Sequence, residues 1–279
     1  MNLLKAWPMA MAENHGHGHG HDNGPCLSVG KPGQRKGKVL VLRPHSGISG
    51  DIMVSGLARM AGLAQEEIDS LLAQLGLEDL VGQVALVDRA VCGITGIGLQ
   101  VDLKPEIAHR SLNDIEKFLG ESALSDKAKN YAMSAFSILA AAEGRVHNLP
   151  PEKVQFHEVG ALDSLLDIGL SAALFDIINP DDFVCGPLPL CDGTIKCAHG
   201  LLPSPAPAVS ILLEGVQVRG LDSAGETVTP TGLALLKSFG ARFGPWPSMT
   251  VERQALVYGT RVLPNVANGA IFALGSLTP

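Results

Sequence analysis

The sequence predicts an α/β or α+β fold, in which a mixed sheet has flanking helices and a disordered His-rich tail precedes it. Hydrophobic residues are 46% of the 279 residues and charged residues 18%, which is a globular composition with a sizeable core. Strand-like aliphatic runs alternate with helical patterns along the chain. We therefore expect a flexible tail over 1–37 and a core domain over 38–279.

The first half of the core domain starts with an unbroken aliphatic run over 38–42, which predicts a strand buried on both faces. A glycine-rich turn follows over 46–51, and helices are expected over 52–61 and 65–76. Residues 83–103 predict two strands around a turn at Cys92 and Gly93.

Two capping serines predict the starts of the next helices. Ser111 with Asp114 at the third position is a variant of the capping box, which predicts a short helix to Phe118. Ser125 starts a longer helix that extends to about Val146.

The last part of the chain predicts one strand, two helices and then two strands, with short strands and proline-rich loops between the helices. The first strand is expected over 153–157 and the two helices over 161–178 and 231–241. The two final strands are expected over 249–258 and 269–274.

Composition excludes several classes of protein. A formal net charge of −7 argues against nucleic-acid binding, which needs basic surface. The odd number of cysteines, five, indicates reduced thiols in a cytoplasmic protein. No apolar run approaches the ~18 residues of a membrane span. The start over 1–12 resembles a signal peptide, but Lys5 and Pro8 interrupt its apolar run.

The tail carries four histidines that alternate with glycines, namely His15, His17, His19 and His21. Neutral imidazoles at this spacing suit an exchangeable Ni, Cu, Zn or Co ion, so the tail is interpreted as a loading arm. The alternative is an unselected low-complexity segment or one that resembles an affinity tag.

Two turns have the chemistry of anion sites. The first, Ser46, Gly47, Ser49 and Gly50 before Asp51, joins a strand to a helix start, where backbone N–H groups gather. The second, over 226–232, offers the hydroxyls of Thr229 and Thr231. Helix capping by Ser49 or Asp51 in the first turn, and by Thr229 in the second, is the simpler alternative.

The central candidate is the stretch that follows the strand over 153–157. His157 and Glu158 end this strand, while Asp163 and Asp167 share a face of the following helix, as Glu143 and His147 do upstream. These groups could form a divalent-metal site or supply a general acid or base. Helix-dipole placement of Asp163 and a buried His157 are equally compatible with the pattern.

Cys185, Cys191 and Cys197 do not have zinc-finger spacing. They are either soft metal ligands or, as we favour, small buried hydrophobic residues. His199, on a loop before a proline-rich segment, is the better functional candidate.

Taken in order, these segments resemble the LarC family of nickel-insertion proteins, from about residue 38 to the end. The matching segments are SGISGDIM, HRSLNDI, AAAEGRVHNLPPEKVQFHEVGALDSLLDI, GPLPLCDGTIKCAHGLLPSPAPA, ETVTPTG and the closing Tyr258-Gly259 and Pro264-Asn265. The resemblance implies a nickel-inserting lyase, or cyclometallase. Its substrates would be Ni²⁺ and pyridinium-3,5-bisthiocarboxylic acid mononucleotide, and CTP would be consumed.

The resemblance also implies roles for the candidate residues. His157, Glu158 and Asp51 would be catalytic. His157, Asp163, His199 and His147 would bind the metal. Phosphates would lie on the 46–51 turn and on Thr229 and Thr231.

The chain departs from the family pattern at several positions. Arg43-Pro44-His45 replaces an Asp-Cys pair, Gln155 replaces the first histidine of the central motif, and the last glycine-rich signature is reduced to Tyr258-Gly259-Thr260-Arg261. The family's C-terminal domain does not follow, so CTP with Mg²⁺ or Mn²⁺ is expected on a separate partner chain. A homo-oligomer is a further candidate assembly. The alternative function is a non-catalytic nickel carrier.

Overall fold

The computed structural model describes residues 37–102, 110–156, 162–197, 199–261, 263, 266 and 269–278. All of them belong to one unit of the chain, Gln34–Pro279. The tail histidines, His157 and Glu158 lie outside the described residues.

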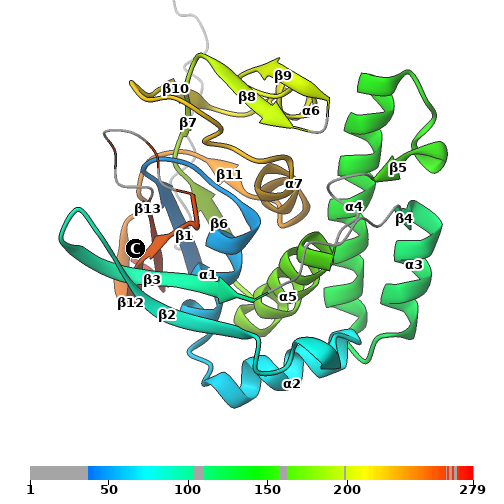
Figure 1. The fold of residues 1–279 in the computed structure, drawn as a ribbon. Helices are drawn as coiled ribbons and strands as arrows, with labels where there is room; N and C mark the ends of the chain where they lie inside the picture. Colours follow the sequence, from blue (N-terminus) through cyan, green and yellow to red (C-terminus); the bar gives the residue numbers. More distant parts are fainter. Residues whose placement is uncertain are drawn as a thin grey trace, which may run out of the picture. The chain divides into compact units, whose positions relative to one another are not determined.

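Within the described residues, the main sheet has seven strands in the order β11-β6-β1-β13-β12-β3-β2 (Figure 1). In this order they are Arg242–Phe243, Asp182–Cys185, Lys38–Pro44, Gly269–Leu277, Met249–Tyr258, Ile94–Val101 and Val84–Val91. Strand β1 is parallel to β6 and antiparallel to β13, so the sheet is mixed, as predicted.

The helices lie in successive layers against this sheet (Figure 1). They are α1 (Gly50–Ala61), α2 (Gln65–Leu75), α3 (Leu112–Glu121), α4 (Asp126–His147), α5 (Leu162–Ile178), α6 (Pro207–Leu212) and α7 (Pro230–Ser238). Helix α1 contacts β3, β12 and β13, α5 packs on α1, and α4 packs on α5 and α7. No helix in the described part of the chain is long and apolar enough to cross a membrane.

The first strand is buried on both faces, as its aliphatic run predicts. Leu40 and Leu42 belong to the large core beneath the helices. Val39 and Val41 pack on the other face of the sheet, in a small cluster with Val184.

Three pairs of short strands lie outside the main sheet. They are β4 (Arg110–Ser111) with β5 (Gln155–Phe156), β7 (Leu188–Leu190) with β10 (Val218–Gly220), and β8 (Thr194–Cys197) with β9 (Gly200–Pro203). Short 3₁₀ turns occur at Glu78–Leu80 and Pro151–Lys153. The β8–β9 hairpin is important below because it forms one wall of a cavity.

Most predicted helix starts are confirmed. The hydroxyl of Ser111 accepts from the Asp114 N–H at 3.2 Å, that of Ser125 from Ala128 at 3.0 Å, and that of Thr229 from Gly232 at 3.1 Å. Ser49 precedes α1, but its hydroxyl donates to the Asp51 carboxylate and accepts no capping bond. Of the two capping residues that the sequence offers as an alternative here, Ser49 therefore does not cap α1 through its side chain.

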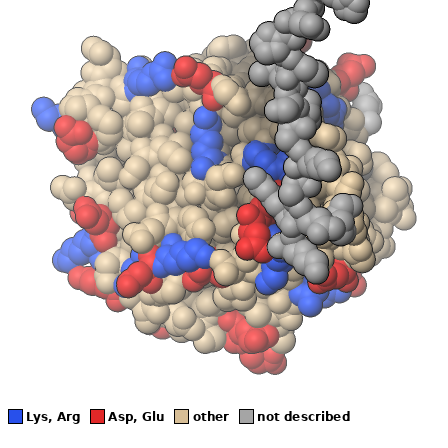
Figure 2. Space-filling model, turned by 180° about the vertical axis from the view of Figure 1, so that it is seen from behind, with Lys and Arg blue, Asp and Glu red and all other residues tan. Residues whose placement is uncertain are grey.

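The rear face of the molecule carries both signs of charge (Figure 2). On the described part of that face, basic and acidic side chains are interspersed, and no large basic patch is visible. The expectation that the chain binds no nucleic acid is compatible with this view and stays a prediction.

Candidate functional site

Two neighbouring cavities contain the candidate residues. The first, of about 650 Å³, we call the histidine cavity because His147 and His199 line it. The second, of about 480 Å³, we call the acidic cavity because Asp51, Asp163 and Asp167 line it. Glu226 and Arg261 line both cavities, so the two share a wall.

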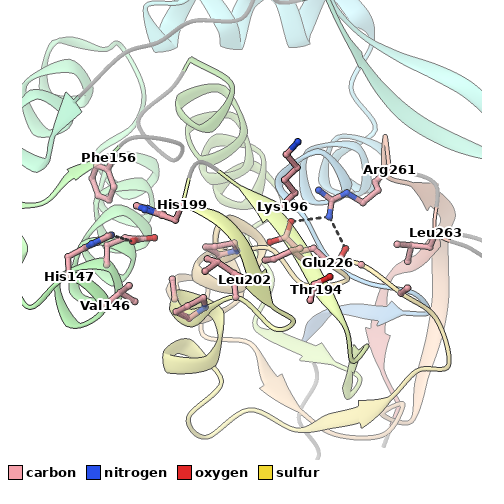
Figure 3. A pocket seen from close by; sticks show the side chains of 18 of the residues that line it. Val146, His147, Phe156, Thr194, Lys196, His199, Leu202, Glu226, Arg261 and Leu263 are labelled. Carbon is pink, nitrogen blue, oxygen red and sulfur yellow. Dashed lines mark hydrogen bonds and ion pairs between the residues drawn. The ribbon is translucent and has the colours of Figure 1, made fainter.

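The histidine cavity is assembled from elements that are far apart in the sequence (Figure 3). Helix α4 contributes Glu143 and His147 at its end, β5 contributes Gln155 and Phe156, and the β8–β9 hairpin contributes His199 among other residues. The rings of His147 and His199 lie 5.1 Å apart between centroids, tilted by 45°. The Nε2 atom of His147 lies 3.5 Å from a carboxylate oxygen of Glu143.

This arrangement brings two predicted metal ligands together and separates a third. His147 and His199 share the histidine cavity, whereas Asp163 lines the acidic cavity. Among the described residues, no three His, Cys, Asp or Glu side chains are placed to hold a metal ion. His157 follows Phe156, which lines the histidine cavity, but lies outside the described residues. The metal-ligand set therefore stays a prediction.

The acidic cavity forms where the two predicted turns meet. The Ile48 N–H donates to the Thr227 carbonyl at 2.8 Å, and the Thr229 N–H donates to the Ile48 carbonyl at 3.0 Å. Ser49, Gly50, Thr229 and Thr231 line the cavity beside the three aspartates. Ser46 and Gly47 are absent from the described lining.

Hydrogen bonds fix two of the three aspartates. Asp51 accepts from the backbone N–H of Thr260 at 2.7 Å and from that of Ile52 at 2.9 Å. Asp163 accepts from the Ser164 N–H at 2.7 Å. Both carboxylates are therefore held in place as hydrogen-bond acceptors.

Asp167 differs from these two. Among the described residues its carboxyl has no hydrogen-bond donor, and it packs against the backbone of Gly50. Desolvation, followed by the like charges of Asp51 and Asp163, raises the pKa of Asp167 well above its usual range. A phosphate in this cavity would face carboxylates, which weakens the prediction that its turns hold one.

Comparisons with known proteins identify the family of the chain. A family model described as a nickel insertion protein matches residues 40–275. The chain belongs to this nickel insertion family. It is 36% identical over 215 residues to the pyridinium-3,5-bisthiocarboxylic acid mononucleotide nickel insertion protein of Staphylococcus epidermidis, covering 77% of this chain and 54% of that protein.

Other similar proteins have related names. The similarly named protein of Geobacillus kaustophilus is 37% identical over 251 residues, covering 86% of this chain and 60% of its own. A putative nickel insertion protein of Thermomicrobium roseum is 40% identical over 230 residues, which are 81% of this chain and 55% of that protein. The chain thus spans a little over half the length of these relatives. No solved structure matches the chain.

In this nickel insertion family member, Gln155, at which the resemblance implies a histidine, lines the histidine cavity. The departure therefore lies at the candidate site itself. A glutamine keeps polar atoms there but lacks the imidazole nitrogen that a borderline metal prefers.

Sequence reasoning missed Lys196 and Arg261 as cavity residues, and it included Glu226 only as the start of the 226–232 turn. A signal was present for Lys196, because it alternates with Thr194 along a short strand before His199. No local pattern marks Arg261, which reaches the cavity only because the β12 end lies beside α1, where the Thr260 N–H binds Asp51.

Two of the predicted thiols are buried, namely Cys185 and Cys191. Burial raises the pKa of the Cys185 thiol to about 12, with a small opposing effect of Arg43. Neither thiol lines the two cavities, so the favoured interpretation as small buried hydrophobic residues fits both. The Cys197 side chain lies outside what the structure describes.

Proposed function

We propose that this chain inserts nickel into pyridinium-3,5-bisthiocarboxylic acid mononucleotide, acting in the cytoplasm as a lyase of nickel-pincer cofactor biosynthesis. The observation that carries the proposal is the pairing of His147 with His199 on the wall of a 650 Å³ cavity. A cavity of this size suits a ligand as large as a mononucleotide. The names of the family and of the relatives support the same reaction.

The reaction makes one nickel–carbon and two nickel–sulfur bonds and releases the proton of a ring C–H. Neutral imidazole nitrogen suits Ni²⁺, so His147, His199 and His157 are proposed to present the ion. A carboxylate is proposed to take the ring proton, with Glu158 and Asp51 as candidates. Asp163 is proposed as a further ligand reached from the neighbouring cavity.

CTP with Mg²⁺ or Mn²⁺ is proposed to take part in the reaction, bound by a partner chain. Hydroxyl and backbone groups of Ser46, Gly47, Ser49, Gly50, Thr229 and Thr231 are proposed to contact the substrate. Ser49, Gly50, Thr229 and Thr231 line the acidic cavity directly.

A second candidate function is that of a nickel carrier that binds and delivers the ion without catalysing a reaction. The four tail histidines favour it, because imidazoles that alternate with glycines along the chain suit exchangeable binding of a borderline ion.

One assay separates the two. Purified protein is incubated with Ni²⁺, the bisthiolated mononucleotide and CTP, with and without a C-terminal-domain partner, and the nickel-containing product is measured by mass spectrometry. Product above the protein-free background is expected. Stoichiometric nickel binding without product, even with the partner, would leave the carrier function.

A further inference from the structure

The histidine cavity has two chemically different ends (Figure 3). His147, His199 and Phe156 lie together at one end, and Lys196, Glu226 and Arg261 lie together at the other. An elongated ligand in this cavity would therefore meet imidazole rings at one end and cationic side chains at the other.

The described lining residues of the second end carry a net positive charge. Nη1 of Arg261 lies 3.1 Å from a carboxylate oxygen of Glu226 and 3.3 Å from its carbonyl oxygen, which fixes the guanidinium on the wall between the cavities. The Lys196 ammonium has no acidic partner among the described residues. Among the described lining residues, two cations and one anion thus face this end of the cavity.

The acidic cavity shows the opposite balance. Beyond Arg261 and Glu226 it presents Asp51, Asp163 and Asp167. A dianionic group would be repelled there and attracted to the Lys196 end, because like charges at short range disfavour binding.

We propose that Lys196 and Arg261 form a phosphate-monoester subsite, which orients a pyridine mononucleotide with its ring towards His147 and His199. The proposal rests on the proposed function for the identity of the ring. A forked guanidinium and a mobile ammonium are the donors that proteins use for phosphate oxygens. The phosphate and the ring are the two ends of a mononucleotide, so anchoring the phosphate at one end leaves the ring beside the imidazoles.

Glu226 is a positioning residue in this arrangement. Its ion pair holds Arg261 at the boundary of the two cavities, which reduces the rearrangement needed when a phosphate arrives.

The test is a binding measurement without nickel. Isothermal titration calorimetry compares nicotinate mononucleotide with nicotinate riboside, and ribose 5-phosphate with ribose, on the full chain. Loss of one charge-assisted bond to phosphate lowers affinity by about tenfold or more. Lys196→Gln is therefore expected to reduce the preference for each phosphorylated probe about tenfold. Lys196→Arg is expected to retain most of the preference for the phosphorylated probes. Lys117→Gln, which removes a surface charge on α3, is expected to leave this preference unchanged.

The outcomes separate this proposal from the proposed function. An unchanged phosphate preference in Lys196→Gln, or no wild-type preference for either phosphorylated probe, overturns the subsite. Lys196-dependent binding of ribose 5-phosphate without any binding of the pyridine mononucleotide supports the subsite and contradicts the proposed substrate.

Discussion

The Asp167 carboxyl lies in the acidic cavity without a hydrogen-bond donor among the described residues. It packs against Gly50, where an added Cβ would lie 2.1 Å from its Oδ2 atom, and it lines a cavity with two other aspartates. Desolvation and the charges of Asp51 and Asp163 raise its pKa. Such a residue is poised to hold or accept a proton inside the cavity.

A stability measurement tests this environment. An acid whose folded pKa is raised binds more protons in the folded than in the unfolded state. Stability is therefore lost as pH rises from the unfolded value near ~4 through the folded pKa. Asp167→Asn removes this loss, so the variant is expected to be more stable than the wild type at pH 7 by about 1 kcal/mol or more.

The difference in the free energy of unfolding between Asp167→Asn and the wild type should become smaller as the pH falls towards about 4. Urea unfolding curves measured at several pH values would show this. Asp88→Asn, an exposed carboxylate on β2, should show no such trend. A variant that is less stable than the wild type at every pH contradicts the assignment.

At the scale of elements, the contact between the two turns explains why glycine stands at position 47. Gly47 has a φ of +153°, and a Cβ there would lie 2.0 Å from the Thr227 carbonyl oxygen. The turn can therefore reach the 226–232 segment, and form the Ile48–Val228 bridge, only if position 47 has no side chain.

Gly47→Ala is expected to lower the free energy of unfolding by roughly 3 kcal/mol, because backbone atoms must move to relieve the overlap. Gly82→Ala is the matched control, since Gly82 also has positive φ but has nothing within 4 Å of an added Cβ. It is expected to cost about 1 kcal/mol. Equal losses in chemical denaturation would show that the turn contact does not matter.

Local elements were predictable because their signals are short-range. The turn at Cys92 and Gly93 joins β2 to β3 with Val91 opposite Ile94, as expected, and the Ser111 capping box forms. Strand pairing was not predictable. Strand β1 lies between β6 and β13, elements more than a hundred residues away, and no local pattern specifies those partners.

The whole molecule combines these elements into one site, and that site was predicted only in part. The i, i+4 face of Glu143 and His147 could be read from the sequence. The ring contact of His147 with His199 could not, because it depends on how the β8–β9 hairpin packs over the end of α4. Arg261 could not be predicted either, because it reaches the cavity through the position of the β12 end beside α1.

The tail histidines concern the whole molecule, because they are expected to supply nickel to a site in the core domain. Deleting residues 1–37 is expected to lower the nickel bound per chain while sparing product formation at saturating nickel, since every cavity residue named here lies beyond residue 37. Nickel is measured by plasma mass spectrometry after dialysis.

Replacing His15, His17, His19 and His21 by Gln separates loss of imidazoles from loss of length. This variant is expected to match the deletion in both nickel content and activity. Complete loss of product in either variant is incompatible with a loading arm.

The most direct test of the account is the rate of nickel-product formation by His147→Ala, compared with the wild type and with His45→Ala. His45 lines neither cavity among the described residues. His147→Ala is expected to keep its fold by circular dichroism and to lose about tenfold or more in rate, because loss of even an outer-shell partner of a metal ligand usually costs about that much. Formation of the product by His147→Ala at the wild-type rate would contradict the placement of nickel insertion in the histidine cavity.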